Sequence, residues 1–217
     1  MPLETYLDHA ASTPLRPEAR EAWTAAVARH HANPTGAHAA ARAARRALDE
    51  ARATLAATLG RQPGEIVFTS GGSESDNLAV RGVAARRPGA VVCGAGEHHA
   101  VLDPVGRLGG TSVPLTRRGS VDLDALAATL DALDRVALVS VMAVNNETGA
   151  ITDVAAVAEV VARHAPGALV HTDAVQAVSW IDVDEATAAA DLVSVTAHKI
   201  GGPVGVGALV VADGVEL

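Results

Sequence analysis

The stretch that decides the fold reads Asp191-Leu-Val-Ser-Val-Thr-Ala-His-Lys199-Ile-Gly-Gly-Pro-Val-Gly-Val-Gly207. An apolar run ends near Thr196, four glycines and a proline follow Lys199, and a second apolar run occupies 208–211. This pattern predicts a buried strand that delivers a lysine to a tight loop, because glycine lets a backbone approach a ligand closely. Such a lysine suits Schiff-base chemistry. For a lone lysine a turn on the surface is the better interpretation. A reactive lysine is therefore indicated only if the rest of the chain supplies the partners that it needs.

Composition narrows the class of protein. The chain has 217 residues, of which 49% are hydrophobic and only 2% aromatic, so Val, Leu, Ile and Ala must build the core. A net charge of −8 without a long basic cluster argues against nucleic acid. The single cysteine, Cys93, favours a reducing compartment. We see no secretory signal and no apolar run long enough for a membrane span, so we expect a cytoplasmic protein that binds no membrane.

Apolar runs and helical patterns alternate along the chain. Because these strands are continuously apolar and helices separate them, we expect a three-layer α/β/α sandwich around a mostly parallel, seven-stranded sheet. The expected strands are 66–69, 90–93, 112–115, 136–141, 169–171, 191–196 and 208–211, and the expected helices are 17–31, 37–59, 74–86, 101–108, 123–130 and 154–164.

Polar or glycine-rich motifs follow the strand ends, where open α/β sheets bind ligands. Ser70-Gly-Gly-Ser73 stands between a strand and a helix, where backbone N–H groups can hold a phosphate. An ordinary helix cap explains this motif equally well. Asp173 follows a buried strand, so its carboxylate needs a partner, either a protonated ring nitrogen or the N–H groups of a short helix.

Two further motifs are weaker by themselves. The pair His98-His99 is typical of solvated histidines, and Cys93 alone is poor support for a metal site. Asn145-Asn146-Glu147 is typical of a turn. Jointly, however, the motifs supply a lysine, an acid for a pyridinium and a phosphate-binding helix N-terminus. Pyridoxal 5'-phosphate needs these three groups, and we expect no metal.

Seven strings also resemble the class V aminotransferase family, and within it the cysteine desulfurases. They occur in the family's order over almost the whole chain. The strings are Tyr6-Leu-Asp-His-Ala-Ala-Ser-Thr-Pro14, Asn33-Pro34, Ile66-Val-Phe-Thr-Ser-Gly-Gly-Ser-Glu-Ser-Asp-Asn77, Glu97-His-His-Ala-Val101, Val144-Asn-Asn-Glu-Thr-Gly149, His171-Thr-Asp-Ala-Val-Gln176 and Thr196-Ala-His-Lys-Ile-Gly-Gly-Pro203.

The resemblance implies a role for each matching residue. Lys199 would form the internal aldimine with the cofactor and later move protons. His98 would stack on the cofactor ring and assist proton transfer, and Asp173 would pair with the pyridine nitrogen. The remaining implied contacts are those of Asn146 and Gln176 with the phenolic oxygen of the ring and its surroundings, and those of Gly72, Ser73, Thr196 and His198 with the phosphate.

The resemblance also implies an activity, in which L-cysteine becomes L-alanine and its sulfur passes to an enzyme cysteine as a persulfide. It implies a homodimer and a sulfur-acceptor protein, such as an iron–sulfur scaffold. It assigns residues 1–15 to an N-terminal arm and residues 16–217 to the large, cofactor-binding domain. A selenocysteine lyase, another class V lyase and a non-catalytic chain with this fold are the alternatives.

Two residues that the family's chemistry needs lie in its C-terminal part, namely the sulfur-accepting cysteine and the arginine that grips the substrate carboxylate. This sequence stops at Leu217. Cys93 is no substitute, because a cysteine within an apolar strand is a small core residue rather than an accessible nucleophile. Two explanations remain, a truncated chain and a natural half-length protein that works with another chain or has lost activity. We favour truncation, and we expect a chain without the small C-terminal domain that does not turn over cysteine alone.

Overall fold

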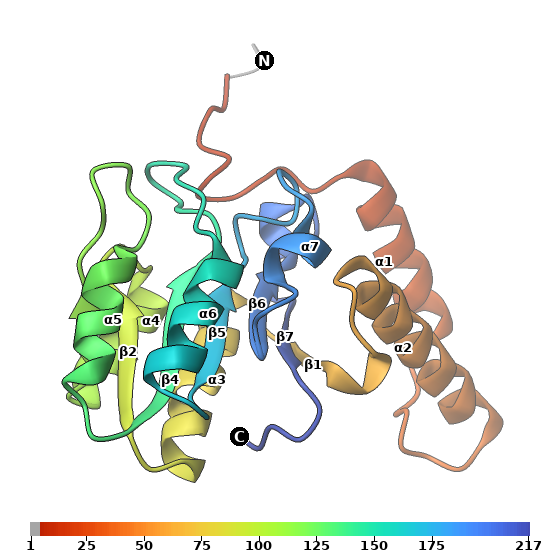
Figure 1. Cartoon of the computed structure of the whole chain (residues 1–217). Helices are drawn as coiled ribbons and strands as arrows, with labels where there is room; N and C mark the ends of the chain where they lie inside the picture. The colour runs from red at the N-terminus through yellow and green to blue at the C-terminus, as the bar shows by residue number, and fades with distance from the viewer. Residues whose placement is uncertain (1–4) are drawn as a thin grey trace.

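A computed structural model describes residues 5–217. Its centre is a seven-stranded sheet with the strand order β1-β7-β6-β5-β4-β2-β3 (Figure 1). β6, β5, β4, β2 and β3 pair in parallel, whereas β7 is antiparallel to both of its neighbours. The strands are β1 (Ile66–Thr69), β2 (Ala90–Gly94), β3 (Thr111–Val113), β4 (Val136–Met142), β5 (Leu169–Asp173), β6 (Leu192–Thr196) and β7 (Gly207–Val211).

Helices cover both faces of this sheet, which confirms the predicted three-layer sandwich. α3 and α4 pack on one face, and α5, α6 and α7 pack on the other. The helices are α1 (Pro17–Arg29), α2 (Ala39–Thr58), α3 (Gly72–Arg86), α4 (His99–Arg107), α5 (Leu123–Asp131), α6 (Val154–His164) and α7 (Val183–Thr187), and two short 3₁₀ turns occupy Pro63–Glu65 and Ala197–Lys199.

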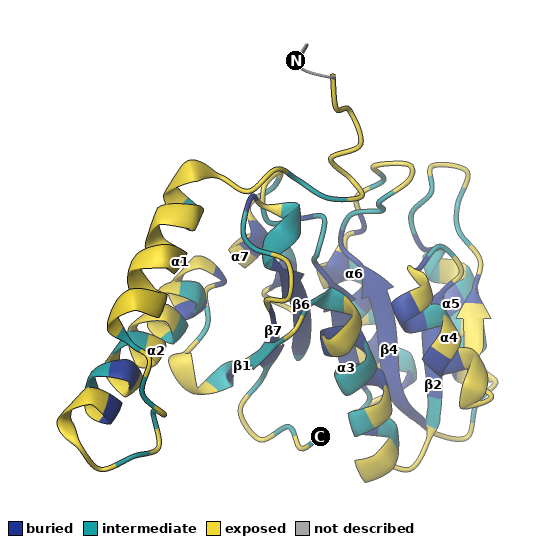
Figure 2. Cartoon of the chain, turned by 180° about the vertical axis from the view of Figure 1, so that it is seen from behind, coloured by how far each residue is buried: buried dark blue, intermediate teal, exposed yellow. Residues whose placement is uncertain are grey.

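The core lies between the sheet and these two helical layers. All seven residues of β4 are buried, as expected for a strand with helices on both sides (Figure 2). Val80 and Val83 of α3 pack against the α3 face of the sheet, and Val157 and Val161 of α6 pack on the other face. Aliphatic side chains thus build both core layers, as the composition predicts.

Two predicted boundaries move in ways that affect function. β5 extends to Asp173, so this aspartate is the last residue of a strand rather than part of the following loop. α3 begins at Gly72, two residues before the predicted start, which places Gly72 and Ser73 in its first turn. The first four N–H groups of a helix have no intrahelical partner.

α1 and α2 lie together at one side of the sheet, beyond β1 and β7 (Figure 1). None of the 13 residues of α1 is buried, and Trp23 and Val27 are both more than half exposed. These two side chains are four residues apart, so they share one face of the helix. An apolar face of α1 is therefore open to the surroundings.

Candidate active site

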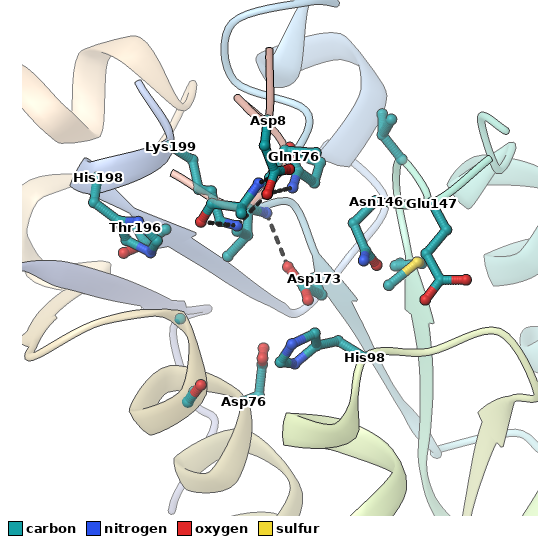
Figure 3. A pocket seen from close by; sticks show the side chains of 17 residues that line it. Asp8, Asp76, His98, Asn146, Glu147, Asp173, Gln176, Thr196, His198 and Lys199 are labelled. Atoms are coloured by element: carbon teal, nitrogen blue, oxygen red, sulfur yellow. Dashed lines mark hydrogen bonds between the residues drawn. The ribbon is translucent and has the colours of Figure 1, made fainter. Parts of the chain in front are cut away.

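One cavity of about 530 Å³ opens at the carboxyl ends of β5 and β6. Its volume is in the range of small-molecule sites. Figure 3 shows Asp173 near its middle, with Lys199, Asp8 and Gln176 on one side and His98 and Asp76 on the other. All nine residues predicted from the sequence line this cavity, namely Gly72, Ser73, His98, Asn146, Asp173, Gln176, Thr196, His198 and Lys199.

The N-terminal segment before α1 holds the lysine loop in place. Thr13 connects the two, because its Oγ1 donates to the His198 carbonyl at 2.8 Å and accepts from the Gly201 N–H at 2.7 Å. The Arg16 N–H also donates to the Gly201 carbonyl at 2.9 Å. Figure 1 shows this segment passing over the end of the sheet before it enters α1. The loop that carries Lys199 is thus fixed from both sides.

Lys199 follows β6 at the end of a single 3₁₀ turn and is partly buried. Its Nζ donates to the Ala11 carbonyl at 2.8 Å and to the Ala10 carbonyl. Burial lowers the pKa of this amine, and the carboxylates of Asp173 and Asp8 oppose the shift. A lysine with a lowered pKa has more of its nucleophilic neutral form near pH 7.

Asp173 is buried at the end of β5, and its Oδ1 accepts a hydrogen bond from the Val175 N–H at 2.9 Å. Burial raises the pKa of this carboxyl. The bond from Val175 and the positive charges of His98 and Lys199 lower it again. A further cationic group placed against this carboxyl would add to these interactions. Asp173 is therefore ready to accept a cation inside the cavity.

The start of α3 forms the third part of the site. Gly72 and Ser73 occupy its first turn, and Thr196 and His198 face them from the end of β6. A Cβ at Gly72 would lie 2.7 Å from Val175 Cγ2, so a larger residue would close this space. Free backbone N–H groups at a helix N-terminus attract anions. This end of the cavity suits a phosphate.

The remaining predicted residues occupy the cavity wall. His98 caps α4 through its Nδ1, which accepts from the Ala100 N–H at 3.1 Å, and its side chain is exposed to the cavity. Gln176 donates from Nε2 to the Ala10 carbonyl at 2.7 Å. Asn146 lies in a loop that Asn145 organises through its Oδ1, which accepts from the N–H groups of Glu147 and Thr148.

Four acids at this site were not predicted from the sequence. Asp8, Asp76 and Glu147 line the cavity, and Glu97 is buried just before His98. Glu97 Oε1 accepts from the Met142 N–H at 2.7 Å, which ties the His98 loop to the end of β4. Asp76 sits inside α3, four residues after Gly72, and this helical spacing was the signal that would have placed it near the cavity.

Residues 5–217 contain neither a metal-binding cluster nor a membrane-spanning helix. No three His, Cys, Asp or Glu side chains gather into a group that could hold a metal ion. In the same range, no helix has the length and apolar character to cross a membrane.

Residues 5–216 match the family model for class-V aminotransferases. The chain belongs to the class-V aminotransferase family. Among curated members, this class-V chain is 45% identical to an IscS-like cysteine desulfurase of Mycobacterium tuberculosis over 94% of its length and 54% of the relative. It is 40% identical to the cysteine desulfurase IscS of Dictyoglomus turgidum over 100% of its length and 56% of that protein. The chain thus spans about half the length of the curated relatives it matches.

Solved structures agree with this family assignment. One described as a NifS-like protein superposes with a TM-score of 0.93 at 33% identity, and covers 98% of the class-V chain and 60% of its own. Another, described as SspA in complex with cysteine, gives a TM-score of 0.85 at 34% identity, with 96% and 61% covered. The predicted family and fold are both confirmed.

Proposed function

We propose that the cavity binds pyridoxal 5'-phosphate and that the chain is the cofactor-binding part of a cysteine desulfurase. One observation carries this proposal. Lys199, which is the only lysine in the sequence, shares a single cavity with the buried carboxyl of Asp173 and with the N-terminus of α3. An amine, an acid and an anion site are the three groups that this cofactor requires.

Each end of the cavity takes one part of the cofactor. The first turn of α3, with Gly72 and Ser73, holds the phosphate together with Thr196 and His198. Asp173 would pair with the ring nitrogen and keep a proton on it, since a buried carboxylate stabilises a cation nearby. Lys199 would hold the aldehyde carbon through Nζ.

Three further side chains orient the ring. His98 would stack on the face of the ring, and Asn146 and Gln176 would contact its phenolic oxygen. Bound in this way, pyridoxal phosphate supplies a ring that withdraws electrons from the α-carbon of an amino acid. The amine of Lys199 is then the group that takes the α-proton.

The substrate that we propose for the complete enzyme is L-cysteine, with L-alanine as product and a persulfide on an enzyme cysteine. The names of the relatives support this choice, since both curated members described above are cysteine desulfurases. The solved SspA structure is described as a complex with cysteine. A sulfur-acceptor protein would take the persulfide sulfur, and we place the enzyme in the cytoplasm.

The cofactor proposal is tested by titrating the 217-residue chain with pyridoxal phosphate and following visible absorption. We expect a band that differs from that of free cofactor, because the bond to Lys199 changes the conjugation of the ring. Lys199→Ala should give only the spectrum of free or non-covalently bound cofactor. If wild type and Lys199→Ala give the same spectrum, the proposal is wrong.

A further inference from the structure

The face of the sheet under α3 changes from apolar to polar along three neighbouring strands. In each strand a leucine of the core is followed two residues later by a polar side chain, and side chains two apart share a face. β5 carries the column Leu169, His171, Asp173. The matching positions are Leu138 and Ser140 in β4, and Leu192, Ser194 and Thr196 in β6.

His171 connects the three strands below Asp173. It is fully buried, and its Nδ1 and Nε2 lie 2.8 Å from Ser140 Oγ and 3.0 Å from Ser194 Oγ. Burial lowers the pKa of His171 to about 3, so the ring is neutral at physiological pH. Both ring nitrogens are satisfied by hydroxyl groups, which can act as donor or acceptor.

Asp76 reaches this polar layer from the opposite side. It shares one face of α3 with Val80 and Val83, which pack on the sheet, and it is 1% exposed. Its Oδ1 lies 3.6 Å from His171 Nε2 and has no hydrogen-bond partner among the residues that the structure describes. That distance is too long for a hydrogen bond, and a neutral imidazole offers no counter-charge. Oδ1 therefore lacks the partner that a buried negative charge needs.

A neighbouring acid also opposes a negative charge on Asp76. The pKa of Asp76 is raised mainly by burial and next by the charge of Asp173 in β5, while the side chain of Ser194 opposes this shift. Two carboxyls that share a buried site do not both ionise. The other groups that face this region are Glu97, His98 and Lys199.

Asp173, in contrast, has stabilising partners for its negative charge. It accepts from the Val175 N–H, and His98 and Lys199 lie on its cavity side. A cofactor nitrogen would add another cation. We propose that Asp76 is a positioning residue that stays a neutral acid between α3 and the sheet, packs under Asp173 and leaves the single negative charge of the pair on Asp173. The inference rests on the proposed function, because the charge of Asp173 is used through the ring nitrogen.

The first test detects the proton itself and needs no cofactor. Infrared spectra of the chain without cofactor should contain the carbonyl stretch of a buried protonated carboxyl at neutral pH, and Asp76→Asn should remove it. Glu97→Gln is the matched control, because Glu97 is a second buried acid and its band should disappear independently. A wild-type spectrum from which Asp76→Asn removes no such band would overturn the proposal.

The second test asks whether a neutral polar group suffices at this position. Asparagine matches the shape of the protonated acid, whereas alanine opens a cavity under Asp173. We expect Asp76→Ala to bind pyridoxal phosphate about tenfold more weakly, which corresponds to about 1.4 kcal/mol, and to shift the pH titration of the visible band. Asp76→Asn should restore both properties. Equal losses in the two variants would mean that a carboxylate is required, and would contradict the proposal.

The two tests separate failure of this inference from failure of the proposed function. A wild-type chain that binds no pyridoxal phosphate would sink the proposed function, while the infrared measurement still decides the state of Asp76. If Asp76→Ala does not fold, the infrared result and the comparison of wild type with Asp76→Asn decide the inference.

Discussion

Cys93 shows how the position of one residue controls its chemistry. It lies in β2 with 1% of its surface exposed, and burial, with a smaller effect of Glu97, raises the pKa of its thiol to about 12. Since the thiolate is the nucleophile, this cysteine is protected from reaction at neutral pH. Its place in the core agrees with the prediction from the apolar run around it.

We therefore expect Cys93 to react with a disulfide reagent only when the chain unfolds. In the native chain at pH 7.5 the labelling rate should be at least about 100-fold slower than in denaturant, because labelling requires an opening reaction. The 217-residue chain should likewise form no persulfide from L-cysteine. Fast native labelling, or a persulfide at Cys93, would contradict this expectation.

Glu97 is the residue for which pH dependence can be predicted with its sign. Burial raises the pKa of its carboxyl well above the usual value, so between the unfolded and folded values the native state binds the extra proton. The free energy of unfolding therefore falls as the pH rises above the unfolded value of about 4.3. Asp173 and Asp76 add to the shift, and the Met142 N–H opposes it.

Glu97→Gln should remove the fall in the free energy of unfolding that Glu97 causes, so stability should depend less on pH above about 4.3. The glutamine oxygen still accepts from the Met142 N–H. Glu97→Ala leaves that N–H without a partner and should cost about 1–3 kcal/mol. Denaturant unfolding at several pH values measures both effects. The same pH dependence in Glu97→Gln and in wild type would show that Glu97 is ionised in the native state.

At the scale of elements, most of the fold could be predicted because strands and helices alternate between clear glycine and proline signals. All seven strands and six of the helices are found within a few residues of their predicted limits. α7 was missed, since it has only five residues and a polar sequence, although Asp182 caps it by accepting from the Glu185 N–H. Short helices are set by such caps and by packing rather than by periodicity.

The site was predictable only in part. Residues at strand ends and in recognisable strings were found, because their sequence neighbourhood marks them. The contacts of Lys199 with the carbonyls of Ala10 and Ala11 join positions 188 or more residues apart, and no local pattern predicts them. Asp76 and His171 were missed as a pair because they lie on different elements, α3 and β5, and no local pattern joins them.

Two glycines provide a matched test of element packing. A Cβ at Gly207 in β7 would lie 2.6 Å from Gly71 Cα, so β7 passes the turn before α3 at close range. A Cβ at Gly106 in α4 meets nothing within 4 Å. We expect Gly207→Ala to lose about 1–3 kcal/mol through overpacking. Gly106→Ala should gain about 0.5–1 kcal/mol through helix propensity.

Thermal or denaturant unfolding of both variants is the appropriate measurement. Because Gly71 precedes the proposed phosphate site, Gly207→Ala should also weaken binding of pyridoxal phosphate, and Gly106→Ala should not. A Gly207→Ala variant as stable as wild type would show that β7 and the turn at Gly71 can move apart freely.

At the scale of the whole molecule, the exposed apolar surface on α1 is available to a second copy of the chain. Trp23 and Val27 form the open face of α1, and we propose a homodimer that covers it. Light scattering should give the mass of a dimer, and Trp23→Glu should raise the dissociation constant by about 30-fold, as loss of about 2 kcal/mol implies. Glu21→Ala is the control on the same helix. A monomer at every concentration would contradict the dimer.

The proposed function depends on a covalent bond between Lys199 and pyridoxal phosphate. Because Lys199 is the only lysine in the sequence, chemical trapping can identify the bond without ambiguity. The chain is incubated with pyridoxal phosphate, reduced with borohydride, digested and mapped by mass spectrometry. We predict one reduced adduct per chain, on the peptide that contains Lys199. An adduct found only at the N-terminal amine, or no adduct at all, would contradict the central claim.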